Sequence, residues 1–238
     1  MNYISESAEK AKKNSREKYI YGDKLVYIKD QLPYGFDLDY VLETIENLIP
    51  RNFFENIDTI YIGKFKDFEN GDLPFNAKYK DNALYITNEQ DSENDMMDDI
   101  VHEVAHAVEE RFEDQIYSDF TIENEYKGKK RTLYHILDQE GYEPSAEQFD
   151  NVEYDKYFDR YLYKVVEYPT LSALTTGLFY SPYAITSLKE YFANGFENYF
   201  LRDQNYLKKT SPILYSRIVD LLNYTEGEKK NEYWDWIY

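Results

Sequence analysis

Residues 98–112 read DDIVHEVAHAVEERF, and the rest of the chain is organised around this stretch. Its apolar residues recur at spacings of three and four, which predicts an amphipathic helix with one buried face. His102 and His106 are four residues apart and therefore lie one turn apart on the same side of that helix, with Glu103 beside them. Two imidazoles can bind one metal ion while the carboxylate holds a water on it, an arrangement typical of zinc metallopeptidases.

The composition of the 238-residue chain limits the classes of protein to which it can belong. Hydrophobic residues make up 42% of the chain, which allows a sizeable core and argues against disorder. The net charge of −19 makes nucleic acid a poor partner, because binding phosphates needs clustered Lys and Arg. There is no Cys, so disulfides and Cys-ligated zinc are excluded, and a zinc site must use His and carboxylates.

The sequence leaves the compartment open. The polar N-terminus, residues 1–24, lacks the apolar region of a signal peptide, and no apolar run approaches the length of a membrane span. These features are compatible with a cytoplasmic protein and with the mature form of a secreted one. We expect a monomer with no membrane-spanning segment.

The order of the expected elements predicts an α+β protein made of two lobes. A small mixed-sheet lobe, residues 1–112, is expected to end in the HEVAH helix. A mainly helical lobe, residues 113–238, follows, and the two are expected to form one domain, residues 1–238, with the active site between them. The expected elements are two short strands within 18–29, a helix at 37–49, strands at 57–65 and 83–87, and helices at 128–140, 154–166, 187–201 and 211–223. The strand at 83–87 could be interior or could lie at the sheet edge, where a peptide could pair with it.

A catalytic zinc ion usually takes three protein ligands and one water, so one more ligand must come from elsewhere in the chain. The metzincin pattern, in which a Gly and a third His follow the motif, is excluded because Glu109 and Phe112 occupy those places. The remaining His, His135, is flanked by apolar residues and is more typical of a structural residue.

Glu190 is the better candidate for the third ligand. It lies on the expected helix at 187–201 and shares one of its faces with Asn194 and Glu197. A carboxylate on one helix facing two histidines on another makes a His2Glu zinc site. Two alternatives stay open at this point. Glu197 is a rival carboxylate, and Ser187 could engage Glu190 in a capping box that involves no metal.

The residues around Glu190 also carry a resemblance to a known family. HEVAHAVEERF, which begins at His102, is followed by YAITSLKEYFA over residues 183–193. This combination resembles the catalytic domain of anthrax lethal factor and its relatives, which include the clostridial Pro-Pro endopeptidases. These zinc metallopeptidases have an HExxH helix, a later Glu ligand followed by Phe or Tyr, Phe and Ala, and a Tyr seven residues before that Glu. The resemblance spans roughly residues 55–205.

The resemblance implies a zincin-like fold and a role for each matching residue. It implies that His102, His106 and Glu190 bind one zinc ion per chain. It implies that Glu103 is the general base and that the Tyr183 hydroxyl stabilises the oxyanion. The activity that it implies is a zinc-dependent endopeptidase in which Glu103 acts on a metal-activated water.

Two features depart from this pattern or compete with it. The family often has an acidic residue one turn after the ligand Glu, where this chain has Asn194. Its carbonyl can accept a hydrogen bond from a ligand histidine but carries no charge, so that histidine would be a weaker donor to zinc. Tyr180 is a near rival for the role of Tyr183.

The substrate is expected to be a protein or a peptide. The acidic balance of the chain favours basic residues near the cleaved bond, and proline specificity is the other precedent in the family. The alternative function is a zinc-binding but inactive pseudo-protease that acts as a protein-binding module. A di-iron carboxylate protein would need a second Glu-x-x-His pair, but Thr132 stands three residues before His135. A purely structural acidic protein with a chance HEVAH would bind no zinc.

Overall fold

The computed structural model describes residues 16–68 and 76–235. It is an α+β structure with a five-stranded mixed sheet, as the sequence predicts. The chain divides into two compact units, Met1–Ala107 and Val108–Tyr238, and the boundary falls within helix α3 (Glu93–Arg111). That the two units form one zincin-like domain stays a prediction.

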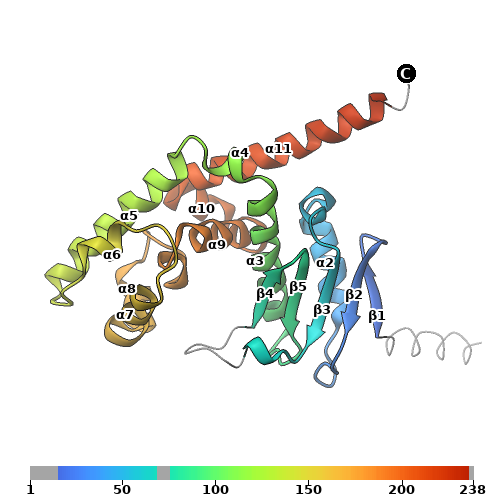
Figure 1. The fold of residues 1–238 in the computed structure, drawn as a ribbon, viewed down its shortest axis with the longest axis horizontal. Helices are drawn as coiled ribbons and strands as arrows, with labels where there is room; N and C mark the ends of the chain where they lie inside the picture. Colours follow the sequence, from blue (N-terminus) through green and yellow to red (C-terminus); the bar gives the residue numbers. More distant parts are fainter. Residues whose placement is uncertain (1–15, 69–75, 236–238) are drawn as a thin grey trace, which may run out of the picture. The chain divides into compact units, whose positions relative to one another are not determined.

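The first unit contains the sheet, whose strands lie in the order β1-β2-β3-β5-β4 (Figure 1). The three central strands are parallel, whereas β1 and β4 at the two edges run antiparallel to their neighbours. Tight turns with positive φ join the antiparallel pairs, at Gly22 in one and at Asp81 and Asn82 in the other. The strands are β1 (Glu17–Ile20), β2 (Lys24–Ile28), β3 (Thr59–Gly63), β4 (Ala77–Lys80) and β5 (Ala83–Thr87).

The strands expected from the sequence are confirmed, and one further strand was not expected. The position of residues 83–87 is decided: β5 is interior, because β4 pairs with its outer side. The missed strand β4 has the sequence AKYK, in which both lysines are exposed and no residue is fully buried. A short edge strand with Lys at alternate positions carries little of the apolar alternation that marks a strand, although it suits a sheet edge.

The apolar face of the sheet and the helices α2 (Leu38–Leu48) and α3 form the core of the first unit. Helix α2 confirms the helix expected at 37–49. Asp37 caps it by accepting a hydrogen bond from the Tyr40 amide, and the chain becomes extended at Ile49, directly before Pro50. The fully buried core side chains of the strands and of α2 are Ile20, Val26, Val41, Ile45, Ile60, Ile62, Leu84 and Ile86.

The second unit is helical in the residues that the structure describes. The helix expected at 128–140 is longer than predicted and begins at Thr121, and the segment expected as one helix at 154–166 is α-helical and then π-helical. The elements after α3 are α4 (Glu113–Tyr117), α5 (Thr121–Gln139), α6 (Ala146–Asp150), α7 (Lys156–Tyr161), η3 (Leu162–Val166), α8 (Tyr168–Leu174), η4 (Tyr183–Ile185), α9 (Leu188–Leu201), α10 (Gln204–Thr210) and α11 (Pro212–Asp235).

Polar contacts from α5 fix the neighbouring helices of this unit. The Glu125 carboxylate accepts hydrogen bonds from the Ile213 and Leu214 amides, which start α11, and from the Tyr191 hydroxyl on α9. The buried Lys129 ammonium donates to the Leu178 carbonyl and to two acceptors before α11. These bonds satisfy the orphan amides of a helix N-terminus and hold α9 and α11 against α5.

No helix within the described residues combines the length and the apolar character needed to cross a membrane.

Candidate metal centre

Helix α3 presents the two histidines of the HEVAH motif on one side. Its other side is core: Ile100, Val101 and Val104 are fully buried. This burial pattern is the stripe predicted from the spacing of the apolar residues. The His102 and His106 rings are half-buried, with their centroids 5.1 Å apart and their planes at 81°. Because the pair lies within one helix, its geometry follows from local structure alone.

Helix α9 carries the third candidate ligand in its first turn. The Ser187 hydroxyl caps the helix by accepting a hydrogen bond from the Glu190 amide at 3.1 Å. Two further bonds fix the segment that leads into the helix. The Leu188 amide donates to the Val152 carbonyl at 2.8 Å, and the Tyr126 hydroxyl donates to the Ile185 carbonyl at 2.7 Å. The predicted capping role of Ser187 is therefore compatible with a ligand role for Glu190, because the cap uses the Glu190 amide.

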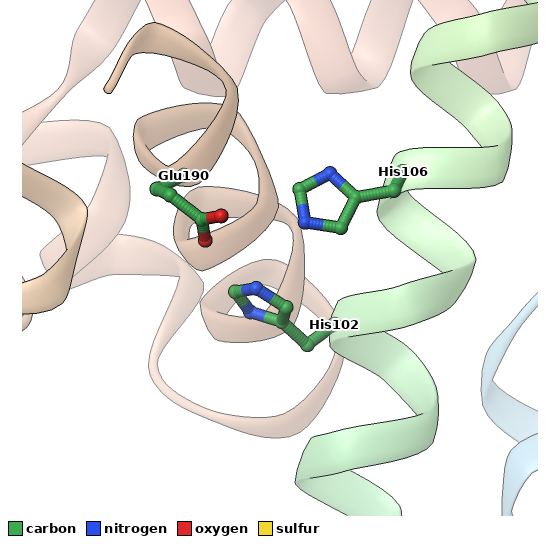
Figure 2. A group of neighbouring side chains, drawn as sticks. All are labelled: His102, His106 and Glu190. Atoms are coloured by element: carbon green, nitrogen blue, oxygen red, sulfur yellow. The ribbon is translucent and has the colours of Figure 1, made fainter. Parts of the chain in front are cut away.

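The structure brings His102, His106 and Glu190 together (Figure 2). Each residue offers one ligand atom, an imidazole nitrogen or a carboxylate oxygen, and these atoms all lie within 4.8 Å of one another. In Figure 2 both rings extend from α3 toward the carboxylate on α9. Ligands of a tetrahedral zinc ion at about 2.0–2.1 Å stand roughly 3.3 Å apart, so small side-chain movements would suffice to close the group around an ion. These three residues could hold a metal ion.

The rival ligands lie outside this group. It is the only such cluster of His and carboxylates within residues 16–68 and 76–235. His135 is exposed on α5 and packs its ring against Tyr134, with the centroids 5.5 Å apart. Glu197 lies on α9 and is 3.9 Å from the Arg202 guanidinium. Asn194 is buried on the same helix, and its contact with a histidine stays a prediction.

Glu103, the predicted general base, is buried, and the residue is only 8% exposed. Its Oε2 accepts a hydrogen bond from the backbone amide of Tyr79 in strand β4 at 2.5 Å. A buried carboxylate needs such partners, because ionisation away from water is otherwise unfavourable. No pattern in the sequence indicated this contact, since β4 itself was not expected.

Tyr183, the predicted oxyanion donor, begins the 3-10 helix η4 and is half-buried. Its carbonyl accepts bonds from the Thr186 amide and hydroxyl, which fix this short turn. Burial raises the pKa of the Tyr183 phenol well above its ordinary value, and the Glu190 carboxylate raises it further. The phenol is therefore protonated near neutral pH and can donate a hydrogen bond. The rival Tyr180 packs against Tyr206 instead, with the ring centroids 5.4 Å apart, and burial likewise raises its phenol pKa.

Two carboxylates near the predicted site residues, one buried and one half-buried, were missed from the sequence. Asp159 is 6% exposed and accepts hydrogen bonds from the Tyr154 hydroxyl at 2.9 Å and the Tyr168 hydroxyl at 3.3 Å. Burial, together with the bond to Asp159 and the charges of Asp159 and Glu190, raises the pKa of the Tyr154 phenol to about 12. No sequence pattern marks Asp159, Tyr154 and Tyr168 as a group, because Asp159 lies on α7 and the two tyrosines lie on the segments before and after it.

The other missed carboxylate, Asp99, lies on α3 one turn before His102. It accepts a hydrogen bond from the Gln90 side chain at 2.8 Å. Burial raises the pKa of Asp99 to about 6, and the neighbouring Glu103 adds to this rise, whereas the Gln90 bond and the charge of His102 lower it. The acidic N-terminal part of α3 thus includes a carboxyl that interacts with His102 and Glu103 of the motif.

Comparison with models of known protein families, with curated proteins and with solved structures finds no match to this chain.

Proposed function

We propose that this protein is a zinc-dependent endopeptidase. The observation that carries the proposal is the gathering of His102, His106 and Glu190, with their ligand atoms within 4.8 Å of one another. Two neutral nitrogen donors and one carboxylate form the His2Glu donor set of catalytic zinc sites, which leave a fourth position for water or substrate. The resemblance of the motifs to the lethal factor family supports the same activity and a zincin-like fold.

The chain supplies a group for each proton and charge in peptide hydrolysis. When bound, zinc would polarise the scissile carbonyl and lower the pKa of a coordinated water. Glu103 would accept the proton of the attacking water and pass it to the leaving amine. Tyr183, as a protonated phenol, would donate a hydrogen bond to the oxyanion. We propose a protein or peptide as the substrate, with basic or proline-containing sequences as the first to be tried.

Metal content tests the ligand set. We would measure zinc by elemental analysis in the wild type, Glu190→Ala and Glu197→Ala, purified side by side. Glu197→Ala is the matched control, because it removes the rival carboxylate from the same helix. We expect one zinc per chain in the wild type and in Glu197→Ala, and a sharp fall in Glu190→Ala. A wild type that stays free of zinc after zinc is added back would overturn the proposal. Retention in Glu190→Ala would exclude Glu190 as the ligand.

Turnover separates the peptidase from the alternative, an inactive zinc-binding module. A peptide library would be incubated with the zinc-loaded wild type, with and without a chelator, and with Glu103→Ala. We expect cleavage that the chelator abolishes. We also expect Glu103→Ala to retain zinc and to lose about 100- to 10,000-fold in rate, the usual contribution of a general acid–base group. Full zinc content without cleavage of any peptide would favour the binding module.

A further inference from the structure

The edge strand β4 directs one backbone amide at the predicted general base. The Tyr79 N–H donates to Glu103 Oε2 at 2.5 Å, and both residues belong to the first compact unit. A backbone donor differs from a side-chain donor because it has no rotamers of its own and is placed by the sheet. The position of this amide is therefore as rigid as the strand that carries it.

The geometry of the hairpin explains why the Tyr79 N–H is available. Asp81 and Asn82 both have positive φ and form a two-residue turn that pairs Lys80 with Ala83. In an antiparallel ladder, hydrogen-bonded and non-bonded pairs alternate, so the next pair, Tyr79 with Leu84, is a non-bonded one. The Thr87 amide donates to the Asn76 carbonyl at 2.7 Å, which fits the same alternation. The Tyr79 amide thus points away from β5, out of the edge of the sheet.

Two hydrogen bonds hold this part of the strand in place. The Tyr79 hydroxyl donates to the Asn56 carbonyl at 3.4 Å. At the turn, the Asp58 amide donates to the Asn82 carbonyl at 2.8 Å. The strand is therefore tied to residues 56–58, which lead into the central strand β3.

We infer that the Tyr79 backbone amide is a positioning group for the Glu103 carboxylate. This inference rests on the proposed function, because it gives the proposed base a fixed orientation. A hydrogen bond from an amide to a carboxylate is charge-assisted and stronger than a neutral one. A carboxylate has about four acceptor sites, so accepting from Tyr79 is compatible with accepting a proton from water as well. A base must stand within hydrogen-bond reach of the proton it takes, and small errors in its placement lower the rate.

Amide hydrogen exchange, followed by NMR on the metal-free protein, tests the contact without any need for activity. We expect the Tyr79 amide to exchange about 10- to 100-fold more slowly than the Ala77 amide, as for a hydrogen bond to a charged group. Ala77 is two residues earlier, and its amide points out of the same edge. Glu103→Ala should abolish this difference and leave the ladder amides of Lys78 and Lys80 unchanged. Glu110→Ala, an exposed change on the same helix, should alter none of them.

Removal of the donor from the strand side tests the positioning role. Tyr79→Pro deletes the N–H, and proline is tolerated at an edge where no ladder bond is lost. Tyr79→Ala keeps the N–H but loses the ring, so the difference between these two variants isolates the amide. Ala77→Pro is the matched control for proline in the same strand. We expect Tyr79→Pro to lower kcat about 10- to 100-fold below Tyr79→Ala, with KM and zinc content unchanged, and Ala77→Pro to turn over as the wild type does.

The two experiments separate failure of this inference from failure of the proposed function. If the Tyr79 amide exchanges as fast as that of Ala77, or is unaffected by Glu103→Ala, the contact is absent and the inference is wrong, whatever the activity. Equal kcat in Tyr79→Pro and Tyr79→Ala would overturn the positioning role while leaving the peptidase intact. A zinc-loaded wild type that cleaves nothing would overturn the proposed function, and with it the positioning role, even where exchange confirms the contact.

Discussion

Two helix-interior glycines, Gly195 on α9 and Gly128 on α5, allow a matched test of how tightly α9 is packed. A Cβ added at Gly128 would meet no atom within 4 Å. A Cβ added at Gly195 would lie 2.8 Å from Leu214 Cγ and would also clash with one of its methyl groups. Leu214 is fully buried, and its amide is held by the Glu125 carboxylate, so it has little room to move.

The expected magnitudes follow from these contacts. Ala is preferred to Gly in a helix interior by up to about 1 kcal/mol, so Gly128→Ala should raise the free energy of unfolding by about that amount. Gly195→Ala has the same gain in propensity, but overpacking of a close-packed core costs about 1–3 kcal/mol. The gap between the two variants is then about 1–3 kcal/mol. For a chain of this size, that corresponds to a Tm difference of about 2–12 °C, with Gly195→Ala the lower.

Thermal unfolding of the two zinc-free variants measures this difference in stability. Zinc titration then tests whether the packing of α9 also affects the candidate metal site. Glu190 lies on the same helix, five residues before Gly195, so a shift of α9 away from α11 would displace the carboxylate. We expect Gly195→Ala to bind zinc more weakly than the wild type and Gly128→Ala to bind it equally well. A Tm for Gly195→Ala as high as that for Gly128→Ala would refute the close packing of α9 on α11. Unchanged zinc affinity in a destabilised Gly195→Ala would refute the link to Glu190.

Three further predictions concern single contacts. Tyr183→Phe should lower turnover by about 100-fold, as for loss of one oxyanion donor, and leave the zinc content unchanged. Tyr180→Phe is the control variant. A wild-type rate in Tyr183→Phe would exclude Tyr183 from the mechanism. Ser187→Ala should lower the free energy of unfolding by about 1 kcal/mol and weaken zinc binding, because it removes the cap of α9. Ser187→Asp is the control, because Asp can also cap a helix. Equal urea midpoints for Ser187→Ala and Ser187→Asp would contradict the capping contact. Burial lowers the pKa of Lys130 from 10.5 to about 8, so the unfolded chain binds more protons between these values and this group adds stability as the pH rises through them. Urea unfolding at about pH 7.5 and 9.5 should show the wild type gaining stability relative to Lys130→Met, and a constant difference would contradict the lowered pKa.

The secondary structure was predicted best where the signal is local. The stripe of buried residues in α3 follows from spacings of three and four, and the cap of α9 follows from Ser187 in front of a helical pattern. The strand β4 was missed because its register and its very existence depend on pairing with β5, and its exposed lysines give no apolar alternation. The π-helical end of the segment at 154–166 was also missed, since the same apolar periodicity fits an α-helix.

The candidate site likewise has one part that the sequence predicts and one part that depends on the tertiary structure. The sequence by itself determined that His102 and His106 share one side of a helix with Glu103 beside them, because residues four apart on a helix must be neighbours. It narrowed the third ligand to Glu190, Glu197 or His135. Only the tertiary structure placed the Glu190 carboxylate within 4.8 Å of both imidazoles.

The contact between the Tyr79 amide and Glu103 depends entirely on the tertiary structure. The approach of the amide to Glu103 depends on the turn that sets the register of β4, and on the position of that edge relative to α3. Neither is encoded in the spacing of nearby residues. Helical periodicity acts over one or two turns, whereas the contacts that complete this site join residues that only chain folding brings together.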